Sequence, residues 1–250
     1  MLEMQEEETQ NNFAPEFYGW VTHPIFAFSP RLINPLLKIG RALRLQTLRH
    51  RKQAAQPPSQ ERMHEEAYPN ASKLPVAEDA QILSLEEELQ LARDGDTETE
   101  AHRISISSSG DCGSDNAGDP VPLVCLNEAM HAAARILIDS RLRRLPFTAP
   151  SIREHVDRVV RETRKIADAS RVSHALAFPL FVAGCEAVDT AARETIASRL
   201  AQQRGLLCNP PGYLAKILRR VWSIRDADPG LDWAAWTSEI SHGFCYYNLF

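Results

Sequence analysis

Residues 175–189 read Ala-Leu-Ala-Phe-Pro-Leu-Phe-Val-Ala-Gly-Cys-Glu-Ala-Val-Asp, the longest apolar run in the chain. The stretch between its polar ends, about 14 residues, is too short for a helix that crosses a bilayer, which needs roughly 20. A run of this kind, apolar nearly all round, predicts a helix buried in a helical core. Pro179 removes one backbone hydrogen bond and should kink or restart that helix. Glu186 is the one charge inside the run, and it therefore needs a partner.

Helical periodicity continues on both sides of this run. Apolar residues recur at helical spacing over residues 121–145, and Pro146 should end that helix. Residues 151–154, Ser-Ile-Arg-Glu, form a capping box that predicts the start of the next helix. After the apolar run, Asp189 or Thr190 should cap a further helix.

Two more helices are expected towards the C-terminus. Their predicted starts are Asn209-Pro210 and Asp232. Period-2 alternation rich in β-branched residues is absent over any useful length, so no strand pattern competes. The predicted fold class is therefore all-α, an irregular bundle of antiparallel helices.

The N-terminal half predicts one basic helix and one acidic helix. Ser29 should cap the first, with Pro30 at its first position. No Asp or Glu occurs between Glu16 and Glu61, and seven basic residues lie in that interval. They could form a basic helix that binds DNA or an anionic surface, or that serves in nuclear import. We favour the solvated face of an amphipathic helix, because the charges are spread at helical spacing. Residues 77–94 form an amphipathic acidic helix.

The domain organisation follows from composition. We expect residues 1–12 to be a disordered tail and residues 13–250 to form a single helical domain. Within that domain, residues 53–76 should be a linker and residues 95–120 a disordered insertion, because that stretch is too poor in apolar residues to offset its chain entropy. The apolar C-terminus indicates docking on the core, or a truncated gene model.

The net charge and the residue composition argue against several classes of protein. A net charge of −5 and a pI near 5.9 give no general case for nucleic-acid binding. Five scattered cysteines with no Cys-x-x-Cys pair fit a reducing compartment better than a disulfide framework or a zinc cluster. The acidic N-terminus is neither a secretory signal nor a transit peptide. No segment is expected to span a membrane.

No motif predicts an active site. Phosphate-binding glycine loops, His-Glu-x-x-His and Gly-x-Ser-x-Gly are absent, and the eight histidines are dispersed. The acidic pair Asp226 and Asp228 is best interpreted as a helix-ending turn. Cys185 has no adjacent base and should be an inert buried thiol. We therefore expect no enzyme, no catalytic or metal-binding residue, and no cofactor.

The same residues carry a resemblance to a known family. Residues 178–187, Phe-Pro-Leu-Phe-Val-Ala-Gly-Cys-Glu-Ala, together with Arg193, Trp222 and Arg225-Asp226, resemble the signature of the fungal-specific transcription factor domain. That domain is the regulatory region C-terminal to Zn(2)-Cys(6) binuclear cluster DNA-binding domains. The ordered resemblance covers about residues 121–236.

The resemblance implies an α-helical regulatory domain that acts in the nucleus in RNA polymerase II transcription. Its partners would be the transcription machinery or other regulatory proteins, with a homodimer also open, and no membrane. The six-cysteine zinc cluster is absent here, so DNA binding and zinc would require a domain missing from this chain. The alternatives are a helical small-molecule-binding protein or enzyme, for example with a prenyl-diphosphate pocket, and a membrane-surface module built on the basic helix.

The motif residues also have a structural interpretation that needs no ligand. Pro179 should bend the buried helix, and small residues should allow close helix crossing. Glu186 should pair with Arg193 or Arg225. The family-motif residues expected to be structural are Pro179, Ala183, Gly184, Cys185, Glu186, Arg193, Trp222 and Asp226.

Overall fold

A computed structural model of the chain describes residues 28–54, 76–107, 121–170, 172–202 and 212–230. Within those ranges the secondary structure is helical and contains no strand, so the predicted all-α class is confirmed. The α-helices are α1 (Ile33–Ala54), α3 (Val76–Ser107), α4 (Val121–Leu137), α5 (Pro150–Arg164), α6 (Ala177–Glu186), α7 (Thr190–Gln202) and α8 (Tyr213–Ala227). The predicted C-terminal helix at Asp232 lies outside the described residues.

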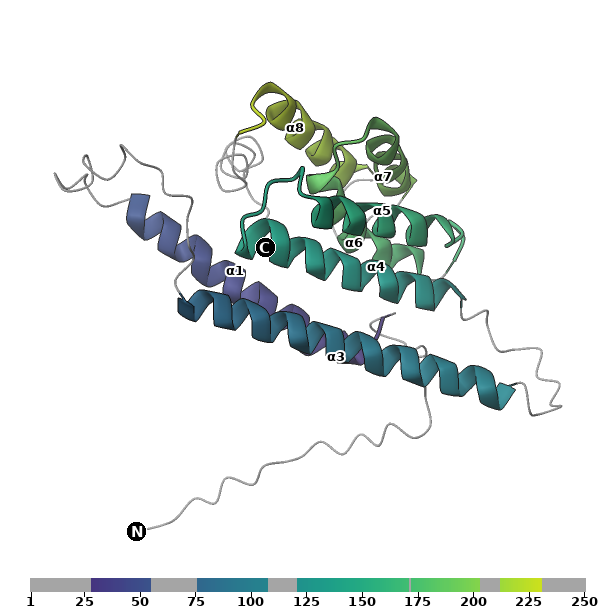
Figure 1. The fold of residues 1–250 in the computed structure, drawn as a ribbon. Coiled ribbons are helices and arrows are strands. Elements are labelled where there is room, and N and C mark those ends of the chain that lie inside the picture. Colours follow the sequence, from purple (N-terminus) through teal and green to yellow (C-terminus); the bar gives the residue numbers. More distant parts are fainter. Residues whose placement is uncertain (1–27, 55–75, 108–120, 171, 203–211, 231–250) are drawn as a thin grey trace, which may run out of the picture.

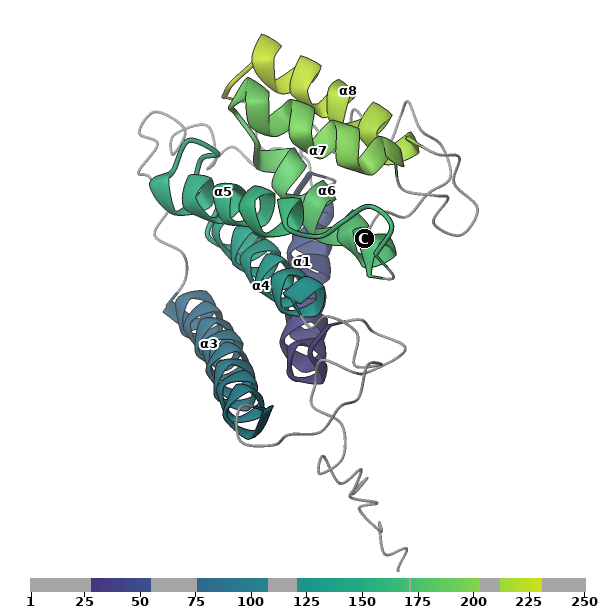
Figure 2. The same ribbon diagram turned by 90° about the vertical axis from the view of Figure 1, so that its right-hand side faces the viewer.

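Helix α4 lies between two groups of helices. The long helices α1 and α3 run side by side on one side of it, and α5 to α8 cover the other (Figures 1 and 2). One hydrophobic core of buried residues extends through both groups, from Leu32 and Ile82 to Ile224. The central helix thus couples the N-terminal pair of helices to the motif-bearing helices.

Helix α6 is the predicted buried helix, but its proline does not bend it. A short 3-10 helix, Ser173–Leu176, precedes α6, and Pro179 is the third residue of α6. The backbone nitrogen of a residue in the first turn has no intrahelical acceptor, so the proline removes no hydrogen bond there. Pro179 therefore fits a restart of the helix, not a kink. Apart from Phe178, every residue of α6 is buried, as its apolar sequence predicts.

Helix α4 continues through a π-helical turn, Ile138–Leu142, and so ends three residues before the predicted Leu145. Contrary to the expectation that no segment could span a membrane, the helix Val121–Leu142 is long and apolar enough to do so by length and composition alone. Two thirds of its most apolar window, 67%, is buried among the other helices. Burial of this extent is what the core helix of a helical bundle shows.

Helix starts agree with the predictions only in part. Ser29 caps the turn Pro30–Leu32 before α1, with its hydroxyl accepting from the Arg31 amide, as predicted. Asp189 caps α7 by accepting from the Ala192 amide at 2.8 Å, which decides between the two predicted caps. The prediction of a capping box at residues 151–154 is wrong, because α5 begins at Pro150 and Ala149 provides no side-chain cap.

Helix α8 begins later than its predicted start at Asn209-Pro210. Its first residue is Tyr213, and Gly212 precedes it with a left-handed backbone, φ 74°. A residue without a β-carbon adopts that conformation without strain. Residues 209 and 210 lie outside the described ranges.

Helix α3 corrects the predicted disordered insertion. We expected residues 95–120 to be disordered, but α3 runs to Ser107, so residues 95–107 are helical. Asp96, in this extension, is only 3% exposed. Composition missed the start of this segment because the contacts of Asp96 are polar. Residues 108–120 lie outside the described ranges, as do the predicted tail and most of the predicted linker.

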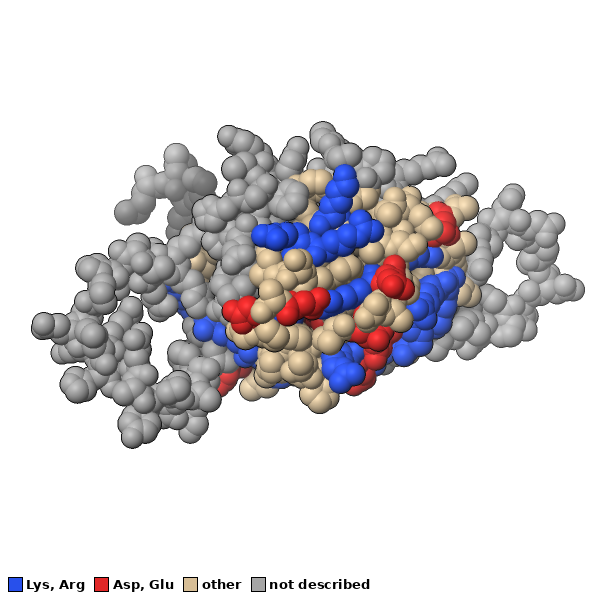
Figure 3. All heavy atoms as spheres, turned by 90° about the horizontal axis from the view of Figure 1, so that it is seen from above, with Lys and Arg blue, Asp and Glu red and all other residues tan. Residues whose placement is uncertain are grey.

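The basic helix α1 packs against the acidic helix α3. Lys38 Nζ lies 2.6 and 2.7 Å from the two carboxylate oxygens of Glu88, and Arg31 donates to the Gly95 carbonyl at 2.6 Å. Two of the basic residues therefore hold α3 in place, while Arg41 and Arg44 are exposed. On the face of the molecule seen in Figure 3, acidic and basic side chains are interspersed, so it carries no continuous field of one sign.

Candidate functional site

The motif residues converge where α6 crosses α8. Gly184 is at the crossing, and the indole Nε1 of Trp222 donates to the Gly184 carbonyl at 2.8 Å. A β-carbon at residue 184 would lie 2.4 Å from Leu218 Cδ1 and 3.1 Å from Ile196 Cγ2. The glycine therefore lets α6 approach α7 and α8 more closely than any larger residue would.

Glu186 lies between two arginines from different helices. Its Oε2 accepts from Arg225 Nη2 at 3.2 Å, and Arg141 Nη2 lies 2.9 Å from its Oε1 in an ion pair without hydrogen-bond alignment. The three side chains are only 3–7% exposed. Burial lowers the pKa of Arg225, and the Glu186 charge opposes this effect. The carboxylate therefore offsets the free-energy cost of burying two guanidinium charges.

Arg225 makes two further contacts. One of its Nη atoms donates to the Cys185 carbonyl, and its guanidinium carbon lies 4.0 Å from the centre of the Phe147 ring. The donor satisfies a carbonyl in the last turn of α6, which has no intrahelical partner. Arg225 thus joins the end of α6, helix α8 and the segment before α5.

Arg193 and Asp226 form a separate pair. The Arg193 guanidinium binds both oxygens of Asp226, at 2.7 and 2.8 Å, and its Nε donates to the Ala187 carbonyl at 2.9 Å. The hydrogen bond from Arg193 is the main cause that lowers the pKa of Asp226. The same guanidinium lies 5.4 Å from the centre of the Trp222 ring. This pair connects the start of α7 to the end of α8.

The prediction that Glu186 pairs with Arg193 or Arg225 is confirmed for one of the two arginines. Its contact with Arg225 is confirmed, and the alternative with Arg193 is wrong, because Arg193 binds Asp226 instead. Arg141 was missed, although an arginine among the apolar residues Ile136, Ile138 and Leu142 of a helix predicted to be buried was a usable signal. Ala183, with 0% exposure, packs in the core beside Gly184.

The arrangement holds helices together and supplies no nucleophile. Burial raises the pKa of the Cys185 thiol to about 12, so the thiolate is scarce near neutral pH. Asp228 ends α8 and accepts from the Gly230 amide, which is the turn predicted for this acidic pair. Within the described ranges, no three His, Cys, Asp or Glu side chains gather as a metal ion would require.

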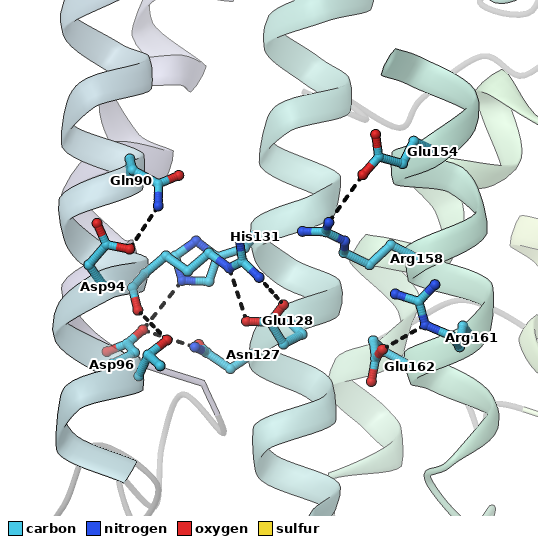
Figure 4. Close-up of polar contacts among 12 residues, drawn as sticks. Gln90, Asp94, Asp96, Asn127, Glu128, His131, Glu154, Arg158, Arg161 and Glu162 are labelled. Atoms are coloured by element: carbon cyan, nitrogen blue, oxygen red, sulfur yellow. Dashed lines mark hydrogen bonds and ion pairs between the residues drawn. The ribbon is translucent and has the colours of Figure 1, made fainter. Parts of the chain in front are cut away.

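A second polar cluster was not foreseen from the sequence. Asp96 of α3 accepts from the Ser29 hydroxyl at 2.6 Å and from Asn127 Nδ2 at 2.9 Å, and His131 Nε2 lies 3.3 Å from it (Figure 4). The Ser29 amide in turn donates to Asn127 Oδ1 at 3.1 Å. All four residues are at most 3% exposed. This Asp96 cluster joins the start of α1 to α3 and α4.

Asp96→Asn should destabilise the protein by about 1–3 kcal/mol at neutral pH, because an amide nitrogen would face donors in a buried site. Burial acts to raise the pKa of Asp96, but hydrogen bonds from His131, Ser29 and Asn127 hold it below its ordinary value of 3.8. A lowered folded-state pKa gives stability that is present above the unfolded-state pKa and is lost as the pH falls through the folded value. Urea unfolding over a pH series measures this difference.

The gap between wild type and Asp96→Asn should therefore stay constant above about pH 5 and close below about pH 4. Asp94→Asn is the matched control, because Asp94 is exposed on the same helix and its carboxylate accepts from Gln90 one turn away. A gap that widens as the pH falls would contradict the lowered pKa.

A comparison with protein families covers nearly the whole chain. A family model described as "Fungal specific transcription factor domain" matches residues 2–247. Searches of curated proteins and of solved structures returned no match.

Proposed function

Since the chain belongs to the fungal-specific transcription factor domain family, we propose that it is the regulatory part of an RNA polymerase II transcription regulator. In this proposal it acts in the nucleus through contacts with the transcription machinery, other regulatory proteins or a second copy of itself. DNA contact is left to a separate zinc-cluster domain. The family match over residues 2–247 is the observation that carries the proposal.

The contacts of the motif residues support a non-enzymatic role. Glu186 and Arg225 are bound to each other, Arg193 is bound to Asp226, and the Trp222 indole is bound to Gly184. Polar groups that bind one another between helices fix the fold and are not free to act on a substrate. Regulatory domains of this kind work through their surfaces, so we expect no turnover of a small molecule.

A tethering assay tests the proposal. The full chain is fused to a heterologous DNA-binding domain in a fungal reporter strain, and a fluorescent tag reports its location. The expected result is nuclear fluorescence and a change of several-fold in reporter expression, in either direction, relative to the DNA-binding domain alone. An unchanged reporter with the fusion present in the nucleus would contradict the proposal.

Two variants separate regulation from an effect of the fusion itself. Glu186→Ala removes a buried charge and should weaken the reporter effect, because it destabilises the fold. Gly40→Ala lies on the exposed face of α1, where an added β-carbon meets nothing within 4 Å, and should keep the full effect. An equal effect from both variants would assign the signal to the fusion and not to the domain.

A further inference from the structure

A cleft with a basic lining lies between α3, α4 and α5. Its volume is about 310 Å³, at the lower end of the roughly 300–1,000 Å³ seen for small-molecule sites. Its charged and titratable lining residues are Arg93, Arg135, Arg158, His131, His155 and Glu154. None of them belongs to the family motif, and the contacts of the motif residues leave this cleft unexplained.

Two buried ring nitrogens of the lining, His131 Nδ1 and His155 Nδ1, have no hydrogen-bond partner among the described residues. A third buried nitrogen, Arg135 Nη1, lies 3.1 Å from Glu86 Oε1 in an ion pair without hydrogen-bond alignment. His131 is only 3% exposed, and its other ring nitrogen is engaged by Asp96 at 3.3 Å (Figure 4). An unsatisfied buried polar group costs about 1–3 kcal/mol. Two such ring nitrogens beside three arginines indicate that the cleft is built to receive polar groups.

Each of the three arginines of the cleft has N–H donors that its ion pair does not use. Arg93 is paired with Glu128 at 3.0 Å, Arg135 with Glu86 at 3.1 Å, and Arg158 with Glu154 at 3.3 Å. Each guanidinium carries five N–H donors, and one carboxylate accepts at most two of them in a bidentate pair. Glu86 and Glu128 are not among the residues that line the cleft.

Among the lining residues themselves, three are arginines and one, Glu154, is a carboxylate. The carboxylates of Glu86 and Glu128 offset the charges of Arg135 and Arg93 from outside the lining. Glu154 is the most exposed member of the set, with 67% of its side chain accessible, so its charge is well solvated. Arg158 extends from α5 beside it (Figure 4). Asp139 also acts electrostatically on His155, so that histidine is influenced by charges of both signs.

We propose that this cleft binds a small anion that carries phosphate or carboxylate groups. The spare donors of Arg93, Arg135 and Arg158 hold its oxygens, and Nδ1 of His155 adds a donor in its N–H tautomer. Nδ1 of His131 donates only when the ring carries both protons, because Nε2 faces the Asp96 carboxylate. The site joins α3 to α4 and α5, so a bound anion stabilises the docking of the α1–α3 pair. This inference does not depend on the proposed function, because it concerns binding alone.

Calorimetric titration of the full chain with inorganic phosphate, and separately with succinate, tests the proposal. Sodium chloride keeps the ionic strength constant in both arms. The expected result is saturable binding of at least one anion and a matching rise in melting temperature. Phosphate binding without succinate binding assigns a phosphorylated ligand, and the reverse assigns a carboxylate.

Arg158→Gln should weaken that binding at least tenfold. Arg161→Gln is the matched control on the same helix, since Arg161 is 60% exposed, binds Glu162 and does not line the cleft. Arg158→Lys keeps the charge but loses the planar fork, and should give an intermediate affinity. These two variants keep the test informative if Arg158→Gln is poorly folded.

Two results would overturn the proposal. The first is the absence of saturable binding of either anion, which would mean that water alone occupies the cleft. The second is equal affinity in the Arg158→Gln, Arg161→Gln and wild-type proteins, which would mean that the anions bind elsewhere on the surface. Neither result affects the transcriptional proposal, whose assay measures reporter expression.

Discussion

Glu186→Ala should lower the free energy of unfolding by about 3–5 kcal/mol, because it removes the shared partner of two buried arginines. Arg141 and Arg225 are 7% and 6% exposed in their side chains. Without the carboxylate their charges would repel each other in a site that water scarcely reaches. The loss should appear as a lower urea midpoint and, for a protein of this size, a melting temperature lower by about 6–20 °C.

Two controls identify the cause of this loss. Glu186→Gln keeps the size and shape of the side chain but removes its charge. If it lowers the free energy of unfolding nearly as much as Glu186→Ala does, the missing charge causes the loss. Glu154→Ala breaks an ion pair that is mostly exposed and should cost less than about 1 kcal/mol. An unchanged urea midpoint in Glu186→Ala would show that the contacts of Glu186 with the two arginines do not stabilise the protein.

Gly184→Ala should destabilise the protein by about 1–3 kcal/mol through overpacking. The new methyl group would lie 2.4 Å from Leu218 Cδ1, and Leu218 is fully buried. Leu218 must change rotamer or α6 must move away from α8, and either change strains the Trp222 hydrogen bond to the Gly184 carbonyl. Thermal and urea unfolding measure the effect.

The matched control is Gly40→Ala in α1, which should stabilise the protein by about 0.5–1 kcal/mol, because the added β-carbon meets no neighbour and the helix gains propensity. A double-mutant cycle then tests the contact itself. Gly184→Ala combined with Leu218→Ala should cost less than the sum of the two single losses. If the two single losses in the free energy of unfolding simply add, the contact between residues 184 and 218 does not cause the destabilisation.

The sequence predicted the helices well where burial alone decides them. Apolar periodicity located α4 to α8, because a helix that faces a core must repeat its apolar residues every three or four positions. It failed at the second half of α3, where Asp96 is buried in a polar cluster that no hydrophobic pattern reveals. It also misplaced the starts of α5 and α8, where Pro150 and Gly212 set the boundary.

The sequence by itself determined that the apolar run at residues 175–189 is a buried helix and that the chain is a helical bundle, and this run with Arg193, Trp222 and Arg225-Asp226 indicated the family. Only the tertiary structure decided that Glu186 is held by Arg141 and Arg225, that Arg193 binds Asp226, and that three arginines and two histidines meet in one cleft. The reason is physical: periodicity is a property of neighbours along the chain, whereas these contacts join residues from different helices. Their partners depend on where the helices cross, and the crossing is set by packing of the whole core.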